Sequence, residues 1–276
     1  MKFMLRPFAR LFANHYLACS RLAGEWMYGR KMMDSGKVTI VNNAIDLKKY
    51  AFNPQKRNLL RKELGLADEF VIGHVGRFMF QKNHEFLIDV FAEAYKKNPH
   101  MALLLVGDGP LRPAMEEKVR KLGLTDHVKF LGLRNNVQDF YHVMDILVLP
   151  SHYEGLPVVG VEAQANGLPC LFSTKVTKET RLTHSAQFLD LEAGASMWAE
   201  EIISIKCERN KKAGDELRQA GFEIYKEAEK LVKFYIELST GGVHEELKSL
   251  RPVPGPSLKR YMPDAFMQLM EMAEIA

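Results

Sequence analysis

Residues 70–109 read FVIGHVGRFMFQKNHEFLIDVFAEAYKKNPHMALLLVGDG, and this stretch decides the fold class. It opens with an apolar run rich in β-branched residues, Phe70–Val75, and closes with a second apolar run, Met101–Val106. Between the two runs, apolar side chains recur at the three- and four-residue spacing of one helix face. Short, continuously apolar strands joined by a helix predict parallel pairing, because strands of a parallel sheet are buried on both faces.

The same alternation continues towards the C-terminus. Further strand-like runs cover residues 128–131, 146–149, 169–172 and 186–189, and helical patterns lie between them. This order predicts an α/β domain with a doubly wound parallel sheet, covered by helices on both faces. Ligands of such sheets bind outside the carboxyl ends of the strands, so the loops that follow the strands are the candidate sites.

Both ends of the chain depart from this alternation. Residues 1–45 contain a helix, a strand over 16–19, a second helix from Ser20 and a strand over 37–42, and we interpret them as the remnant of another domain plus a linker. Residues 46–235 form the predicted α/β domain. Residues 236–276 are rich in glycine, proline and methionine, a composition typical of a linker, and this tail receives no function.

Bulk composition excludes several classes of protein. The 276 residues are 47% hydrophobic and 26% charged, which is ordinary for a globular protein. A net charge of +4 predicts no binding to nucleic acid. The three cysteines lack metal-type spacing, which favours a reduced, cytoplasmic setting. No apolar run approaches the length of about 20 residues that a membrane helix needs.

The N-terminal segment is basic and apolar at once. Residues 1–37 hold seven lysines and arginines against two acidic residues, interleaved with Phe3, Phe8 and Leu11. They lack the continuous apolar core of an export signal. One interpretation is peripheral contact with anionic lipid at the inner face of a membrane. The alternative is packing against an absent domain, in which case the exposed remnant favours self-association.

A cationic loop follows the first predicted strand. Gly76 and Arg77 end that strand, and Lys82 stands at the opening of the next helix. A guanidinium and an ammonium that converge beside a helix N-terminus suit a diphosphate, whereas the alternative is two solvated loop cations. The position at a strand's carboxyl end favours the diphosphate. Since the sequence contains no Asp-x-Asp pair, we expect these cations to neutralise the diphosphate without a metal ion or other cofactor.

A second candidate loop, Glu154-Gly155-Leu156-Pro157, follows the strand-like run 146–149. Pro157 is suited to the first position of a helix, and Leu156 before it has no side-chain oxygen to cap that helix. The free amides therefore favour an anionic ligand. Glu162 follows in a nearly all-apolar helix that should be buried. A buried carboxylate needs a partner, and we expect a ligand to supply it, although a lone helical glutamate is more often solvated.

Other signals are weaker. The turn Gly107-Asp-Gly-Pro110 permits tight backbone geometry, and its aspartate is equally well explained as a cap. The dinucleotide fingerprint GxGxxG is absent after the first strand, which argues against an ordinary NAD enzyme. His74, His84 and His152 lie near the candidate loops, and we expect them to be structural.

Taken in order, these motifs resemble the donor domain of the family-4 (group 1) retaining glycosyltransferases, in particular bacterial members that build exopolysaccharide or capsule. The resemblance covers about residues 14–235 and rests on four ordered motifs, each weak alone. The motifs are Gly76-Arg77 with Lys82-Asn83, then Val106-Gly-Asp-Gly-Pro110, then Phe130-Leu-Gly132, and finally Ser151-His-Tyr-Glu154-Gly-Leu-Pro157 with Glu162-Ala163.

The resemblance implies a GT-B fold of two Rossmann-like halves, of which the C-terminal half binds a nucleotide sugar and the other binds the acceptor. It implies transfer of a sugar, with retention, from a donor that we expect to be a UDP-sugar to a saccharide or lipid-linked acceptor. The resemblance implies that Arg77 and Lys82, beside Gly76, bind the diphosphate. It implies that Glu154 contacts the sugar and is catalytic, with the amides of Gly155 and Leu156 near sugar and phosphate. It also implies that Glu162 binds the ribose and that the base lies near Leu133.

One departure from the family pattern is large. Family members carry a longer segment before the part that matches residues 14–20, so the resemblance implies that most of the acceptor half is absent here. We therefore expect nucleotide binding with little transfer, and the alternative is a truncated, non-catalytic nucleotide-sugar-binding domain. A 2-epimerase shares the architecture, but the pair Glu154 and Glu162 together with Arg77 and Lys82 favours the transferase.

Overall fold

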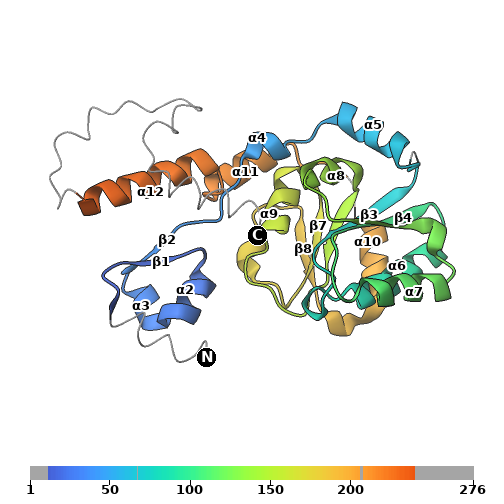
Figure 1. The fold of residues 1–276 in the computed structure, drawn as a ribbon, viewed down its shortest axis with the longest axis horizontal. Coiled ribbons are helices and arrows are strands. Elements are labelled where there is room, and N and C mark those ends of the chain that lie inside the picture. Colours follow the sequence, from blue (N-terminus) through green and yellow to red (C-terminus); the bar gives the residue numbers. More distant parts are fainter. Residues whose placement is uncertain (1–11, 67, 206–207, 240–276) are drawn as a thin grey trace. The chain divides into compact units, whose positions relative to one another are not determined.

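The computed structural model describes residues 12–66, 68–205 and 208–239, and the chain divides into two compact units, residues 1–224 and 225–276. Six parallel strands form the main sheet of the first unit (Figure 1). The predicted doubly wound α/β fold is confirmed. In spatial order the strands are β5 (Val128–Gly132), β4 (Met101–Val106), β3 (Phe70–Val75), β6 (Ile146–Leu149), β7 (Cys170–Ser173) and β8 (Ala186–Leu189).

The strand order reverses between β3 and β6. From β3 the chain runs outward through β4 to β5, then returns to the other side of β3 and continues through β6 to β8. β3 and β6 pair directly, with Ile72 opposite Ile146 and Gly73 opposite Leu147. Successive crossovers therefore leave these two strands in opposite directions. The carboxyl ends of β3 and β6 form the crevice in which doubly wound sheets bind their ligands.

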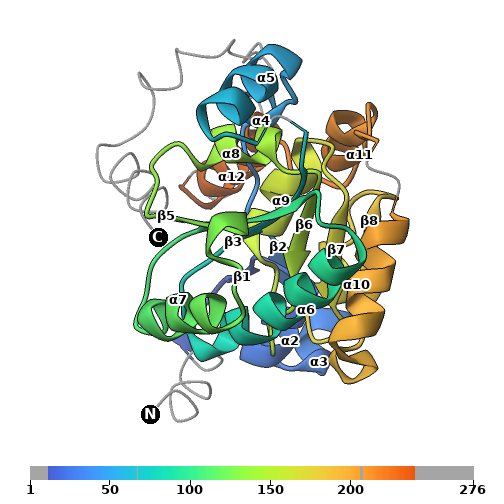
Figure 2. The same ribbon diagram turned by 90° about the vertical axis from the view of Figure 1, so that its right-hand side faces the viewer.

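Helices cover both faces of the sheet (Figure 2). One face carries α6 (His84–Lys97), α7 (Arg112–Lys121) and α10 (Gly194–Ser204), whose buried side chains pack in one cluster with those of β3, β4 and β6. The other face carries α5 (Pro54–Glu63), α8 (Val137–Val143) and α9 (Val158–Ala165). All six residues of β4 are buried, which explains why its sequence is apolar without alternation.

The segment before the main sheet forms a small sheet of its own. β1 (Tyr16–Ala18) pairs in parallel with β2 (Val38–Ile40), and α2 (Arg21–Tyr28) and α3 (Arg30–Asp34) lie between them in sequence. The predicted strand, helix and strand are confirmed, and the Ser20 side chain caps α2 by accepting from the amide of Ala23. The helix expected at the start of the chain lies outside the described residues apart from Phe12.

The remaining elements are short, except for the last helix. They are α4 (Leu47–Tyr50), η1 (Phe80–Lys82), η2 (Thr125–His127), η3 (Lys178–Thr180), η4 (Leu191–Ala193) and α11 (Ala213–Gln219), and α12 (Ile224–Ser239) begins where the first unit ends. In the part of the chain that the structure describes, no helix is both long and apolar enough to cross a bilayer. The predicted glycine- and proline-rich tail lies outside the described residues from 240 onwards, and the domain boundaries at 45 and 235 stay predictions.

Candidate functional site

The loops after β3 and β6 meet at the carboxyl edge of the sheet. The Asn83 side chain donates to the carbonyl of Pro150 at 3.1 Å, and the His152 amide donates to the carbonyl of Gln81 at 2.8 Å. Asn83 adopts a left-handed conformation (φ 55°), in which asparagine is the residue most often tolerated after glycine. The structure thus brings together the two loops that the sequence singles out.

Arg77 is the exposed cation of the first loop. Its side chain makes no hydrogen bond or ion pair with any residue that the structure describes. Gly76 before it is half-buried, and Phe78 after it is fully buried. An exposed guanidinium between two anchored neighbours is available to a ligand.

The turn after β4 supports this loop from below. A Cβ atom on Gly107 would lie 2.1 Å from the carbonyl oxygen of Gly76, and one on Gly109 would lie 2.5 Å from that of Phe78. Both glycines also have positive φ angles, 136° and 158°. The amide of Phe78 donates to the carbonyl of Asp108 at 3.0 Å. The glycines are therefore required for close backbone packing under the Arg77 loop, and the Asp108 side chain caps its own turn by accepting from the Gly109 amide.

Lys82 and Glu154 form an ion pair between the two loops. The Nζ atom of Lys82 lies 2.5 Å from Oε1 of Glu154, and the side chains are only 16% and 9% exposed. Two further side chains donate to the same carboxylate, Gln81 at 3.2 Å and Ser151 at 3.2 Å. The Glu154 amide also donates to the carbonyl of Lys175, in the loop after β7, at 3.3 Å. Glu154 is therefore a fixed anion beside one of the two predicted diphosphate cations.

The start of α9 faces the same loop. Pro157 is the N-cap residue, and the helix begins at Val158, one residue later than the sequence predicts. The extended conformation of Pro157 (φ −71°, ψ 120°) is the reason, because an N-cap residue lies outside the helical region. The predicted lack of a side-chain cap is confirmed. Gly155 is exposed and Leu156 is half-buried, so the backbone before the helix is accessible.

Glu162 has partners inside the chain. Its Oε1 accepts from the Tyr50 hydroxyl at 2.7 Å, and its Oε2 accepts from the Tyr141 hydroxyl at 2.6 Å. Burial raises the pKa of Glu162, and the two hydroxyls oppose that rise. The expectation of a partner for this carboxylate is confirmed, but α4 and α8 supply two partners from the chain itself, which the sequence did not predict. The ribose role of Glu162 stays a prediction.

Leu133 lies at a different point of the sheet edge. It follows β5, two strands away from β3, which corresponds to about 10 Å at the usual strand spacing. Its side chain is 79% exposed, and Gly132 before it has a positive φ of 69°. An exposed leucine at this position offers an apolar surface, and its assignment to the base stays a prediction.

Two buried histidines underlie the Arg77 loop. The Nδ1 atom of His74 lies 2.8 Å from the carbonyl oxygen of Val148, and the His84 ring stacks on Phe78 with centroids 4.0 Å apart. Burial is the main cause that lowers the pKa of His74 to about 4 and that of His84 to about 2. Both rings are therefore neutral at physiological pH. Neither ring nitrogen of His84 has a hydrogen-bond partner among the residues that the structure describes.

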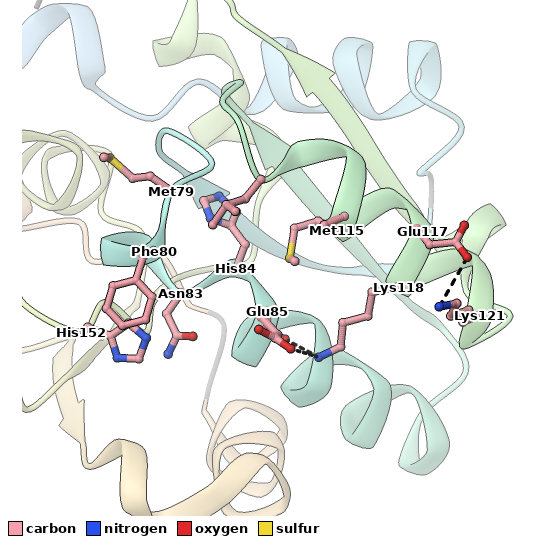
Figure 3. A pocket seen from close by; sticks show the side chains of 12 residues that line it. Met79, Phe80, Asn83, His84, Glu85, Met115, Glu117, Lys118, Lys121 and His152 are labelled. Atoms are coloured by element: carbon pink, nitrogen blue, oxygen red, sulfur yellow. Dashed lines mark hydrogen bonds and ion pairs between the residues drawn. The ribbon is translucent and has the colours of Figure 1, made fainter.

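A hollow of about 520 Å³ lies beside the candidate site (Figure 3). It opens between α6 and α7, and the Phe80 and His152 rings, stacked 4.3 Å apart, border it. The ion pair of Lys118 with Glu85 lies along it, so neither sign of charge predominates. None of the predicted site residues lines this hollow. It is a neighbour of the candidate site rather than part of it.

Sequence reasoning missed four side chains of this region. Gln81 and Ser151 contact Glu154, and Tyr50 and Tyr141 contact Glu162. Ser151 belongs to the same sequence motif as Glu154, so a contact between the two could have been predicted from the sequence. The tyrosines had no signal, because they lie far from Glu162 in sequence. Among the described residues, no group of three or more histidine, cysteine or acidic side chains is placed to hold a metal ion.

Comparison with known proteins gives a consistent family. The family model described as Glycosyl transferases group 1 matches residues 56–211. The putative glycosyltransferase EpsF of Bacillus subtilis (strain 168) is 35% identical over 242 residues, which make up 85% of this chain and 63% of the relative. The UDP-Gal:alpha-D-GlcNAc-diphosphoundecaprenol alpha-1,3-galactosyltransferase of Escherichia coli is 34% identical over 145 residues, 51% of this chain and 38% of the relative. The chain thus spans less than two thirds of the length of these relatives.

Solved structures show the same fold. The crystal structure of HepE from Anabaena in complex with UDP-glucose superposes with a TM-score of 0.71 at 23% identity, over 85% of this chain and 67% of that one. Sucrose-phosphate synthase from Thermosynechococcus elongatus gives a TM-score of 0.71 at 22% identity, over 87% and 62%. This likeness confirms the Rossmann-like α/β fold of the GT-B type that the sequence predicts.

Proposed function

Since the chain belongs to the group 1 glycosyl transferases, we propose that it serves the transfer of a sugar from a nucleotide-sugar donor to a saccharide or lipid-linked acceptor. The donor is a UDP-sugar, the anomeric configuration is retained, and the product belongs to an exopolysaccharide or another cell-surface glycan. One observation carries the proposal. The loop that carries Arg77 and Lys82 meets the Glu154 loop at the strand-order reversal, the position where doubly wound sheets bind nucleotides.

The cations act on the leaving group. Arg77 and Lys82 bind the diphosphate through charge-assisted hydrogen bonds, which grow stronger as negative charge develops on the departing oxygen. The uncapped amides at the start of α9 add positive potential at the same place. This set of donors replaces a metal ion in the proposal, which requires no cofactor.

Glu154 acts on the sugar. A carboxylate that is fixed by Lys82, Gln81 and Ser151 can accept hydrogen bonds from sugar hydroxyls and orient the anomeric carbon. An acceptor hydroxyl then attacks the face from which the nucleoside diphosphate departs. The Gly155 and Leu156 backbone borders the sugar and the phosphate, and Leu133 borders the base.

The names of the relatives support the choice of donor and pathway. The Anabaena protein is seen with UDP and with UDP-glucose, and the Escherichia coli relative is named as a transferase that uses UDP-Gal and a diphosphoundecaprenol-linked acceptor. By analogy with these proteins, we propose a UDP-sugar as the donor of this chain and a lipid-linked saccharide as its acceptor. Such an acceptor would place the protein in the cytoplasm at the inner face of the membrane, held there by the basic N-terminal segment.

The second candidate function is binding of a nucleotide sugar without turnover. It requires only the two donor loops, which the Lys82–Glu154 ion pair and the Asn83–Pro150 hydrogen bond join. In that case the donor loops bind their ligand, but no acceptor is held close enough to react, and the chain associates with itself or with a partner.

Calorimetry with UDP, GDP and ADP tests the shared part of both functions. We expect UDP to bind, and to bind more weakly by about tenfold or more in the Arg77→Ala and Lys82→Ala double variant, since charge-assisted hydrogen bonds contribute about 1.5–3 kcal/mol each. If the double variant retains the parent affinity, the assignment of the site is wrong. Release of UDP from UDP-glucose in the presence of a lipid-linked saccharide then separates the transferase from the binding module.

A further inference from the structure

Two phenol hydroxyls hold one carboxylate in the predicted ribose site. Tyr50 at the end of α4 donates to Oε1 of Glu162 at 2.7 Å, and Tyr141 in α8 donates to Oε2 at 2.6 Å. The two rings lie 6.2 Å apart between centroids, with planes at 52°. Each oxygen is thus held from a different element, and the plane of the carboxylate is fixed.

Both tyrosines are themselves fixed. Tyr141 is fully buried, and burial and then the charge of Glu162 raise its pKa well above the ordinary value of 10.0, so it remains a donor. The backbone carbonyl of Tyr50 accepts from the Asn166 side chain at 2.8 Å. Burial thus restrains the Tyr141 ring, and the Asn166 contact anchors the backbone of Tyr50.

The tyrosines leave half of the acceptor capacity of Glu162 unused. A carboxylate offers about four acceptor positions, two on each oxygen, and each tyrosine occupies one of them. One position remains on each oxygen. Two adjacent acceptors match two adjacent donors, and the hydroxyls at positions 2′ and 3′ of a ribose are such a pair.

The location of Glu162 agrees with this ligand. It lies four residues after Val158, the first residue of α9, which corresponds to about 6 Å along the helix axis. The start of α9 adjoins the Glu154 loop and the predicted diphosphate site. A ribose diol that binds at Glu162 therefore lies close to the site predicted for the phosphates of the same nucleotide.

We propose that Tyr50 and Tyr141 are positioning residues that orient Glu162 towards the ribose diol and make the donor site selective for a nucleotide with both hydroxyls. The inference rests on the proposed function, because it assigns the ribose of the nucleotide-sugar donor to Glu162. It also extends the donor site to α4, which precedes the segment that the family model matches, residues 56–211. The structural alternative is that the phenols only satisfy a buried carboxylate.

The test compares UDP with 2′,3′-dideoxy-UDP by calorimetry in the full chain. The variants are Tyr50→Phe, Tyr141→Phe and Glu162→Gln. Tyr95→Phe is the matched control, because Tyr95 lies on α6 and its hydroxyl is hydrogen-bonded to Nε2 of His127 at 2.8 Å. We expect each of the Tyr50 and Tyr141 variants to weaken UDP binding by about threefold to tenfold, the range that corresponds to one net hydrogen bond. Their affinity for the dideoxy nucleotide should be unchanged.

The possible outcomes separate the two levels of the proposal. If the tyrosine variants lower thermal stability but keep the parent ratio of the two dissociation constants, the role is structural and the inference is overturned. If Glu162→Gln also keeps that ratio, Glu162 does not bind the ribose, which overturns the inference while the diphosphate site stands. Failure of the parent chain to bind any nucleoside diphosphate removes the proposed function itself, and the inference with it.

Discussion

The ammonium of Lys82 lies 2.5 Å from the carboxylate of Glu154, so one predicted diphosphate cation is paired with the residue predicted to face the sugar. Both side chains are largely buried, 16% and 9% exposed, and Coulomb interactions are strong in such surroundings. A diphosphate that enters this site must share Lys82 with Glu154 and must also approach the negative charge of Glu154. We therefore expect the ion pair to hold the two loops together and, at the same time, to weaken binding of the nucleotide.

Glu154→Gln should therefore change the affinities for UDP and for UDP-glucose by different amounts. Removal of the negative charge should tighten the binding of UDP by about threefold or more, because a diphosphate no longer approaches a carboxylate. UDP-glucose should gain less, because its sugar loses a carboxylate acceptor. The free energy of unfolding should fall by about 3–5 kcal/mol as Lys82 loses its charged partner.

Calorimetry with both ligands and denaturant unfolding measure these effects. Glu93→Gln is the control, because Glu93 also pairs with a lysine, Lys96 at 2.7 Å, but on the surface of α6. Unchanged or weaker binding of UDP by Glu154→Gln would show that the ion pair does not compete with the nucleotide.

Arg77 should respond differently to substitution. It has no side-chain partner among the described residues, so Arg77→Ala should leave the free energy of unfolding within about 0.5 kcal/mol of the parent. The same change should weaken UDP binding about tenfold or more, the effect of one charge-assisted contact. Arg120→Ala on α7, whose side chain is 69% exposed, is the control that should change neither quantity. Loss of stability without loss of binding would identify Arg77 as a structural residue.

The sequence predicted the main sheet because its strands are continuous apolar runs. The predicted strands Phe70–Val75 and Met101–Val106 have the same bounds in the structure. Burial on both faces makes such strands apolar throughout, and a continuous apolar run is easy to recognise in a sequence. The order of the strands was not predicted, since nothing local encodes that β3 pairs with both β4 and β6. The reversal between β3 and β6, which explains why the Arg77 and Glu154 loops meet, appears only in three dimensions.

The partners of the candidate residues were less predictable than the residues themselves. Glu162 was singled out because a carboxylate in an apolar helix needs a partner, and that physical argument is right. The two tyrosine partners were not predicted, because Tyr50 and Tyr141 precede Glu162 by 112 and 21 residues and reach it only through the packing of α4 and α8 against α9. Periodicity identifies buried faces, but it does not tell which distant side chain meets a buried charge.

Metal independence follows from the proposed use of Arg77 and Lys82. If these cations and the amides at the start of α9 neutralise the diphosphate, the dissociation constant of UDP should be the same, within about twofold, with EDTA and with magnesium or manganese. Titrations of the same preparation under the three conditions measure this. A strict requirement for a divalent ion would mean that the nucleotide carries the metal into the site, and the proposed role of the two cations would then be incomplete.

His84 is 2% exposed, and within the described part of the chain neither of its ring nitrogens has a hydrogen-bond partner. Burial lowers its pKa from 6.5 to about 2. Between these values the unfolded chain binds a proton that the folded chain does not, so His84 costs stability as the pH falls below 6.5, about 2 kcal/mol at pH 5. His84→Phe keeps the ring that stacks on Phe78 and removes both nitrogens.

This variant should be more stable than the parent by about 1–3 kcal/mol at pH 7.5, the cost of an unpartnered buried polar group, and its advantage should widen at pH 5. Denaturant unfolding at the two pH values measures the difference, and His100→Phe, at an exposed position, is the control. Some acid sensitivity should remain, because burial also lowers the pKa of His74 and of His142 to about 4. An advantage that shrinks at pH 5 would mean that the His84 ring takes up its proton in the folded chain, and that a polar group or water reaches the space under the Arg77 loop.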